Sequence, residues 1–379
     1  MRPITGQEEE AFRFLCDLVA SDIRGDAPSA CLQAVDPSAL VSLALRHRVL
    51  GLLSRLSQPP AALRAAIMSQ AQAGLRQAAA LIAIITAAQK RGLALMVLKG
   101  LPLSVQLHGD PFRRGGVDID LLVSPACFMA AADILIDMGY VPDPDGPPLA
   151  AMTSGSQHIR DLTFIGHGQI VELHRRLYEL SSRLPSDFDT LWRDRGEVAL
   201  GPVRVATLGD QHLALYLLVH GYGHDWERLR WLLDLALLLI RPGAMERLEA
   251  QARQFRVQRA RTEALALISH LFGPLPGFPA NDAVPVRPLR RMAQYGARMQ
   301  LAPKSAAWFA FSLGQKWRDY RLHDGMADFL RALLRDLAAN SDDMALFKLP
   351  PGLIWLYPLL RPIGFLWRNV LPALRPNRQ

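Results

Sequence analysis

Hydrophobic residues recur every three or four positions over most of the chain, which is the spacing of helices that bury one face. This pattern covers residues 7–91 and 207–241 and continues through 245–272. It returns over 289–340 after a proline-rich stretch at 274–288. We expect the segment 210–240 to form one long helix. The pattern predicts a largely helical protein.

Residues 93–178 depart from this helical pattern. The apolar run 93–100 ends in glycine, and VDIDLLV at 117–123 is rich in the branched aliphatic residues typical of buried strands. Two more short strands are expected near 159–166 and 169–174, with helices over 101–109 and 124–140. We therefore predict an α+β fold, in which a small mixed β-sheet is embedded in helices.

The same patterns divide the chain into four regions. They are an N-terminal helical region (1–92), an α/β core (93–206), a C-terminal helical region (207–342) and a basic, aromatic tail (343–379). No Gly/Ser linker separates the first region from the second, so that boundary is approximate.

Composition narrows the classes of protein to consider. The 379 residues carry a formal net charge of +8, which favours anionic partners such as nucleotide phosphates, nucleic acid or acidic lipid. Three cysteines are too few for a disulfide framework or a zinc cluster. The N-terminus carries an acidic run where a signal peptide would be basic and then apolar. We expect a cytoplasmic protein, not a secreted or polytopic membrane protein.

Two carboxylates lie in the second predicted strand. Because side chains alternate along a strand, Asp118 and Asp120 share one face. Adjacent carboxylates repel each other unless a cation lies between them, and their oxygens suit Mg²⁺ or Mn²⁺. The alternative to a metal site is that the two carboxylates simply lie on a solvent-exposed face of the strand, as isolated Asp-x-Asp pairs often do.

The surroundings of this pair favour phosphate chemistry. Lys99 and Gly100 end a strand and open a helix, where backbone N–H groups can receive phosphate. Arg114 lies in the intervening loop, and Glu172 offers a third carboxylate on another strand. His174 shares the strand face of Glu172, and we expect it to lie near the metal on the acceptor side of the site. Carboxylates, a glycine turn and basic residues together indicate metal-assisted phosphoryl or nucleotidyl transfer.

A polar stripe follows the apolar segment 210–240. At helical spacing its members occupy one face, which we expect to line the acceptor side of the site or to form a hydrogen-bonded core network. The stripe consists of His220, His224, Glu227, Trp231 and Asp234.

The run VLKGLPLSVQLHGDPFRRGGVDIDLLV, followed by IVELH, resembles the uncharacterised nucleotidyltransferase family of the DNA polymerase beta type. HGYGHDWERLRWLLDLA is similar to a later segment of that family, and the resemblance spans roughly residues 40–240. It implies that Asp118 and Asp120 are the first two metal ligands, Glu172 the third, and Gly100 the phosphate-facing turn. Leu101 replaces the usual Ser or Gly after that turn, and Glu replaces the more common Asp.

The resulting hypothesis is a Mg²⁺- or Mn²⁺-dependent nucleotidyltransferase. It would move a nucleoside monophosphate from a nucleoside triphosphate to a hydroxyl or phosphate of an unknown peptide, glycan or small molecule, as in natural product biosynthesis. The alternative is a catalytically silent binding protein of the same fold, or an adaptor docked on a membrane.

The tail supplies the membrane alternative. Residues 343–379 interleave Trp and Tyr with arginines and six prolines, which suits a segment lying on an anionic bilayer better than one crossing it. The tail could instead pack against the protein itself. Nucleic-acid binding is not favoured, because the aromatic residues lie among aliphatic ones and form no stacking motif.

Overall fold

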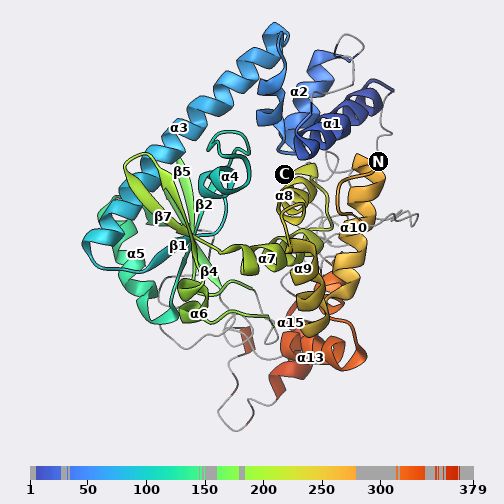
Figure 1. Ribbon diagram of the computed structural model, residues 1–379. Helices are drawn as coiled ribbons and strands as arrows, with labels where there is room; N and C mark the ends of the chain where they lie inside the picture. The colour runs from blue at the N-terminus through green and yellow to red at the C-terminus, as the bar shows by residue number, and fades with distance from the viewer. Residues whose placement is uncertain are drawn as a thin grey trace, which may run out of the picture.

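A seven-stranded mixed sheet, in the order β3-β4-β5-β2-β1-β7-β6, lies at the centre of the computed structural model (Figure 1). The structure describes mainly residues 6–26, 35–144, 160–178, 184–278, 316–337 and 356–365. Strand β2 runs parallel to β5, and β1 runs parallel to β7. All other neighbours are antiparallel. The predicted α+β class is confirmed.

Four strands were expected and fall close to their predicted positions. They are β1 (Leu95–Val97), β2 (Asp118–Val123), β4 (Asp161–Gly166) and β5 (Gln169–His174). Three strands were not anticipated: β3 (Val141–Pro142), β6 (Gly196–Leu200) and β7 (Val203–Thr207). The last two form a hairpin whose alternating burial surrounds the turn at Gly201 and Pro202, a recognisable signal that was overlooked.

Helices α3 (Ala61–Lys90) and α5 (Phe128–Asp137) cover one face of the sheet (Figure 1). Leu81 and Ile84 of α3 share a buried apolar core with Leu121 of β2 and Val171 of β5. Among the described residues, α3 alone is long and apolar enough to span a membrane by length and composition.

The opposite face is covered by helices from both ends of the chain. Leu98, directly after β1, and Leu122 of β2 lie in one core with Leu15 of the N-terminal region and Leu232 of the C-terminal region. Besides the start of α3, the helices contributing to this larger core are α1 (Gly6–Arg24), α2 (Pro37–Arg46), α4 (Leu101–His108), α6 (Phe188–Arg193), α7 (Asp210–Gly223), α8 (Leu229–Leu239), α9 (Ala244–Gln254) and α10 (Gln258–Phe272), with the 3₁₀ turn η2 (Leu50–Arg55).

The prediction of one helix over 210–240 is wrong, because the chain breaks between α7 and α8. Asp225 and Trp226 adopt positive φ angles of 60° and 51°, which end the first helix. Trp226 then folds back onto Gly221, where a Cβ would lie only 2.1 Å from the indole ring. The glycine thus permits a sharp reversal that helical spacing alone does not reveal.

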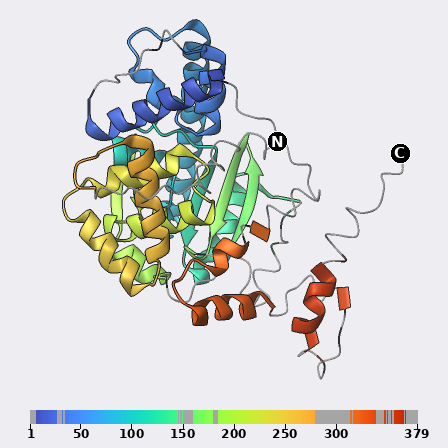
Figure 2. The same ribbon diagram turned by 90° about the vertical axis from the view of Figure 1, so that its right-hand side faces the viewer.

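Helices α13 (Met326–Leu337) and α15 (Tyr357–Phe365) lie below the main body in both views (Figures 1 and 2). They contact each other. The helical prediction for 289–312 and most of the tail, including Lys348, Trp355, Arg368, Arg375 and Arg378, falls outside the described residues.

Candidate active site

The register of two parallel strands brings the predicted carboxylates together. Asp120 of β2 lies beside Glu172 of β5, and Asp118 lies beside Ile170. Side chains two residues apart on a strand share a face, so Asp118, Asp120 and Glu172 all line one pocket.

The tightest group of possible metal ligands in the described part of the chain is Asp120, Glu172 and His174, with ligand atoms within 4.8 Å of one another. His174 Nε2 lies 3.4 Å from Asp120 Oδ1 and 3.5 Å from Glu172 Oε2. Two carboxylates and an imidazole form a donor set that suits Mn²⁺, and the carboxylates also suit Mg²⁺. Asp118 lines the same pocket but lies outside this group.

Lys99 balances the charge of the buried carboxylate. Its Nζ lies 3.0 Å from Asp120 Oδ1, and Asp120 is only 1% exposed. Burial alone would raise the pKa of Asp120, but the Lys99 ammonium and the hydrogen bond with His174 hold that pKa well below its usual range. A cation therefore already lies against the oxygen that the sequence assigned to a metal.

His174 is surrounded by three carboxylates. Besides Asp120 and Glu172, Asp161 Oδ1 lies 3.6 Å from its Nδ1. Burial acts to lower the pKa of His174, but hydrogen bonds to the three carboxylates raise it to about 10. In the metal-free protein this imidazole is a cation at neutral pH.

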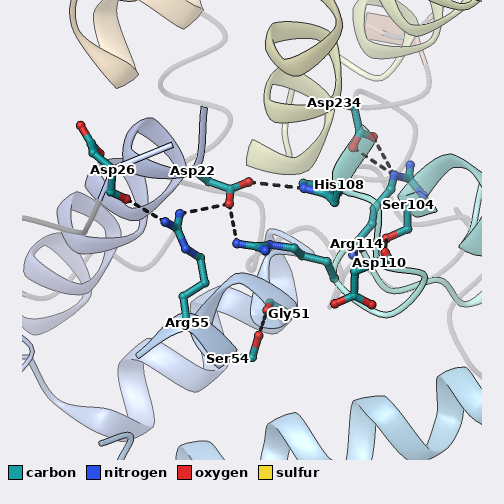
Figure 3. Close-up of polar contacts among 11 residues, drawn as sticks. Asp22, Asp26, Gly51, Ser54, Arg55, Ser104, His108, Asp110, Arg114 and Asp234 are labelled. Carbon is teal, nitrogen blue, oxygen red and sulfur yellow. Dashed lines mark hydrogen bonds and ion pairs between the residues drawn. The ribbon is translucent and has the colours of Figure 1, made fainter. Parts of the chain in front are cut away.

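Arg114 is fixed by a buried ion pair (Figure 3). Its Nε lies 3.0 and 2.9 Å from the two carboxylate oxygens of Asp234, and its backbone N–H donates to Ser104 Oγ at 3.0 Å. Arg114 lines the pocket, whereas Asp234, expected on the acceptor side, lies behind it as the partner of the guanidinium.

A second network holds the loop before β2 against the N-terminal region (Figure 3). Asp22 of α1 lies 2.7 Å from Arg113 Nη2, 3.1 Å from Arg55 Nη1 and 3.4 Å from His108 Nδ1. The hydrogen bond with His108 and the two guanidinium groups overcome burial and lower the pKa of Asp22. One carboxylate thus ties together α1, η2, α4 and the loop.

Close backbone contacts hold the same loop from another side. A Cβ on Gly51 of η2 would lie 2.0 Å from the carbonyl oxygen of Arg113. A Cβ on Gly116 would lie 2.7 Å from Gln77 Oε1 of α3. The absence of side chains at Gly51 and Gly116 therefore leaves the space that the loop leading to Asp118 needs.

The site opens into a pocket of about 360 Å³, within the range of small-molecule sites. His220, His224 and Trp231 form one aromatic wall, with the ring centroids of His220 and His224 each about 5–6 Å from that of Trp231. Gly100, at φ 72°, begins α4 at the pocket edge, in a conformation that favours glycine. The structure thus brings together the candidate residues from five separate segments.

Several pocket residues were missed from the sequence. Tyr216 stacks on His220 and precedes it by four residues, so helical spacing offered a signal. Four cationic residues of the pocket were also missed. Arg48 and Arg160 lie in segments that gave no local signal, whereas Arg228 and Arg230 lie within the segment of the polar stripe but off its helical spacing.

The solution structure of the antibiotic-resistance factor ANT(2'')-Ia matches at 16% identity and a TM-score of 0.36, covering 49% of this chain and 95% of the other. No curated protein matches the sequence. The family described as uncharacterised nucleotidyltransferase matches residues 33–273, well over half of the chain. The predicted family is therefore confirmed, and the chain belongs to the uncharacterised nucleotidyltransferase family.

Proposed function

We propose that this protein transfers a nucleoside monophosphate from a nucleoside triphosphate to a hydroxyl or phosphate group. Membership of the nucleotidyltransferase family supports nucleotidyl transfer in general. The observation that carries the specific proposal is the convergence of Asp120, Glu172 and His174 in a pocket also lined by lysine and arginine. Carboxylates beside cations suit a metal-bound polyphosphate.

Asp120 and Glu172 would hold a Mg²⁺ or Mn²⁺ ion, with Asp118 and His174 beside them. Their donor atoms fit such an ion, since two carboxylates lie close enough to share it. A bound divalent ion would supply positive charge to the phosphate oxygens. Lys99 would contribute a second positive charge at the same place, since its ammonium lies against Asp120.

Lys99, Gly100 and Arg114 would bind the phosphates of the donor. All three line the pocket close to the carboxylates. Asp234 would act as a positioning residue, because its ion pair fixes the direction of the Arg114 guanidinium.

His220, His224 and Trp231 would form the acceptor side. Burial and the nearby charge of Lys99 lower the pKa of His220 well below its ordinary value, so its imidazole is neutral at pH 7. A neutral imidazole can accept a hydrogen bond from an acceptor hydroxyl. The enclosed aromatic wall favours a small molecule, or a side chain or sugar of a peptide or glycan, as in a natural product tailoring step.

We further propose that the basic, aromatic tail (343–379) contacts an anionic membrane surface. Three apolar side chains in or next to α15 are more than half exposed: Leu359 at 66%, Ile363 at 54% and Trp367 at 58%. Exposed apolar residues in a basic segment suit the interface of an acidic bilayer.

The test of transfer is release of pyrophosphate. The full chain is incubated with each nucleoside triphosphate, Mg²⁺ and pooled candidate acceptors, and products are identified by mass. We expect release with at least one nucleotide and a loss of at least about 100-fold in Asp118→Asn, because losing this carboxylate weakens binding of the divalent ion that would neutralise the phosphates. Undiminished transfer by a folded Asp118→Asn variant would contradict the assigned role of Asp118.

A further inference from the structure

Three arginines gather in the pocket outside the carboxylate group. Arg48 follows the end of α2, Arg228 immediately precedes α8, and Arg230 lies in the first turn of α8. All three line the pocket. We call Arg48, Arg228 and Arg230 the arginine cluster.

His47 links the segment that carries Arg48 to the start of α8, which carries Arg228 and Arg230. Its carbonyl oxygen accepts from the backbone N–H of Arg230 at 3.3 Å, and its Nδ1 accepts from the N–H of Leu229 at 3.4 Å. The end of α2 thereby caps the start of α8. The backbone then changes direction at Arg48, which has a positive φ of 59°.

Arg230 is the most buried member of the cluster, at 9% exposure. Its Nη1 donates to the carbonyl oxygen of Gly115 at 3.2 Å. Its Nε is buried with no hydrogen-bond partner among the described residues. A buried guanidinium N–H without an acceptor is costly, so a bound anion would relieve that cost.

The electrostatic surroundings of Arg230 are also positive. Burial, together with the charges of Arg114, Arg228 and Arg48, lowers the pKa of Arg230 to about 9 against the opposing charge of Asp234. Positive charges therefore outweigh negative ones around this side chain. An anion of two or more charges would balance them.

Arg228 is held by an aromatic contact. Its guanidinium carbon lies 5.3 Å from the centroid of the Trp231 ring. Stacking on an indole fixes the plane of a guanidinium, which lowers the entropy lost when it binds a phosphate in bidentate fashion.

We propose that Arg48, Arg228 and Arg230 form a phosphate-binding subsite within the nucleotidyltransferase pocket. This inference rests on the proposed function, because the phosphate would belong to a substrate of nucleotidyl transfer. The phosphate has two sources: the β- and γ-phosphates of the donor nucleotide, or a phosphate on the acceptor. Planar guanidinium groups match either source, since both present tetrahedral oxyanions.

The first measurement is binding of inorganic pyrophosphate, by calorimetry without added metal so that no divalent ion bridges to the carboxylates. Arg228→Gln and Arg230→Gln are compared with wild type. Each should raise the Kd about tenfold or more, because each removes charge-assisted hydrogen bonds. Arg253→Gln is the matched control: its side chain is 72% exposed on α9, and its Kd should equal that of wild type.

The source of the phosphate is distinguished with nucleotides. If the cluster binds the donor, both variants weaken ATP binding but leave AMP binding unchanged. If it binds the acceptor, ATP affinity is unchanged and inorganic phosphate binding to the ATP-saturated protein is weakened. Unchanged pyrophosphate affinity in Arg228→Gln and Arg230→Gln would overturn the proposal.

Failure of the subsite and failure of the proposed function give different results. Pyrophosphate binding that depends on the cluster, in a protein that transfers no nucleotide, would reject transfer and keep the subsite. Nucleotide transfer by the wild type, together with unchanged pyrophosphate affinity in the variants, would reject the subsite and keep the proposed function. Arg230→Lys, which keeps the charge, and thermal unfolding of every variant separate lost binding from lost folding.

Discussion

At the scale of single residues, Asp120 has two roles that are hard to separate. It is a candidate metal ligand, and it also neutralises Lys99 at 3.0 Å in a buried site. Repulsion between adjacent carboxylates would by itself make the removal of one of them harmless to stability. The ion pair changes that expectation, because removal leaves an ammonium without its partner.

We therefore expect Asp120→Ala to lower the free energy of unfolding by roughly 3–5 kcal/mol, as for other broken buried pairs. Asp118→Ala, at a half-buried position outside the ion pair, should cost less than about 1 kcal/mol. Urea unfolding of both variants measures the difference. Equal stability of the two would show that the Lys99 pair contributes nothing.

His47 gives a residue-level prediction about pH. Burial, with the charges of Arg46 and Arg228, lowers its pKa to about 3, so it is neutral in the folded protein. The unfolded chain takes up a proton below about pH 6.5, so the stability from this residue is complete above that pH and is lost as pH falls toward 3. The loss between pH 7 and pH 5 should be about 2 kcal/mol.

The measurement is urea unfolding of wild type and His47→Gln at both pH values. The variant should lose less stability on acidification than wild type, whatever its stability at pH 7. Identical pH slopes would mean that His47 does not remain neutral in the folded state.

At the scale of elements, the loop between α4 and β2 depends on its neighbours for its position. Asp22 contacts His108, Arg113 and Arg55, and Gly51 leaves space for the carbonyl of Arg113 (Figure 3). The loop also carries the guanidinium that Asp234 fixes. The N-terminal region thus contributes to the site through these contacts, and Arg48, in the turn after α2, lines the pocket itself.

Asp22→Asn should loosen this loop, because a neutral amide no longer attracts two guanidinium groups. We expect amide hydrogen exchange across residues 109–117 to accelerate by about tenfold or more. Asp26→Asn is the control, since the Asp26 carboxylate pairs with Arg24 at the exposed end of α1. Equal exchange in both variants would remove Asp22 from this positioning role.

At the scale of the whole molecule, the largest core joins the N-terminal helices with helices as far along the chain as α10. Leu15 and Leu18 of α1 lie in the same core as Leu232 of α8 and Leu267 of α10. Residues of the regions 1–92, 93–206 and 207–342 therefore share one core.

We expect the fragment 93–379 to lack a cooperative unfolding transition, because removing residues 1–92 exposes that core to water. The full chain should unfold in a single step, with coincident transitions by circular dichroism and tryptophan fluorescence. A cooperative melt of the fragment would contradict this view of the core.

Local patterns predicted much of this architecture but little of the contact between distant segments. Alternation along β2 placed Asp118 and Asp120 on one face, and the sheet register agrees. His220, His224 and Trp231 still lie together although the predicted helix is broken. The chain reversal at Trp226 places both imidazole rings against the indole of Trp231. Contacts such as Arg114 with Asp234 depend on tertiary packing, which no spacing along the chain encodes.

The in-register pairing of β2 with β5 also limits which sequence lengths this scaffold tolerates. Deleting one residue from β5 would shift its later positions by one, so Val171 and Leu173 would exchange sides with Glu172 and His174. Aliphatic groups would then face the pocket, while charged ones would enter the apolar layer beneath α5. Length changes within this family should therefore collect in the connecting turns, and only substitutions should accumulate inside the two strands.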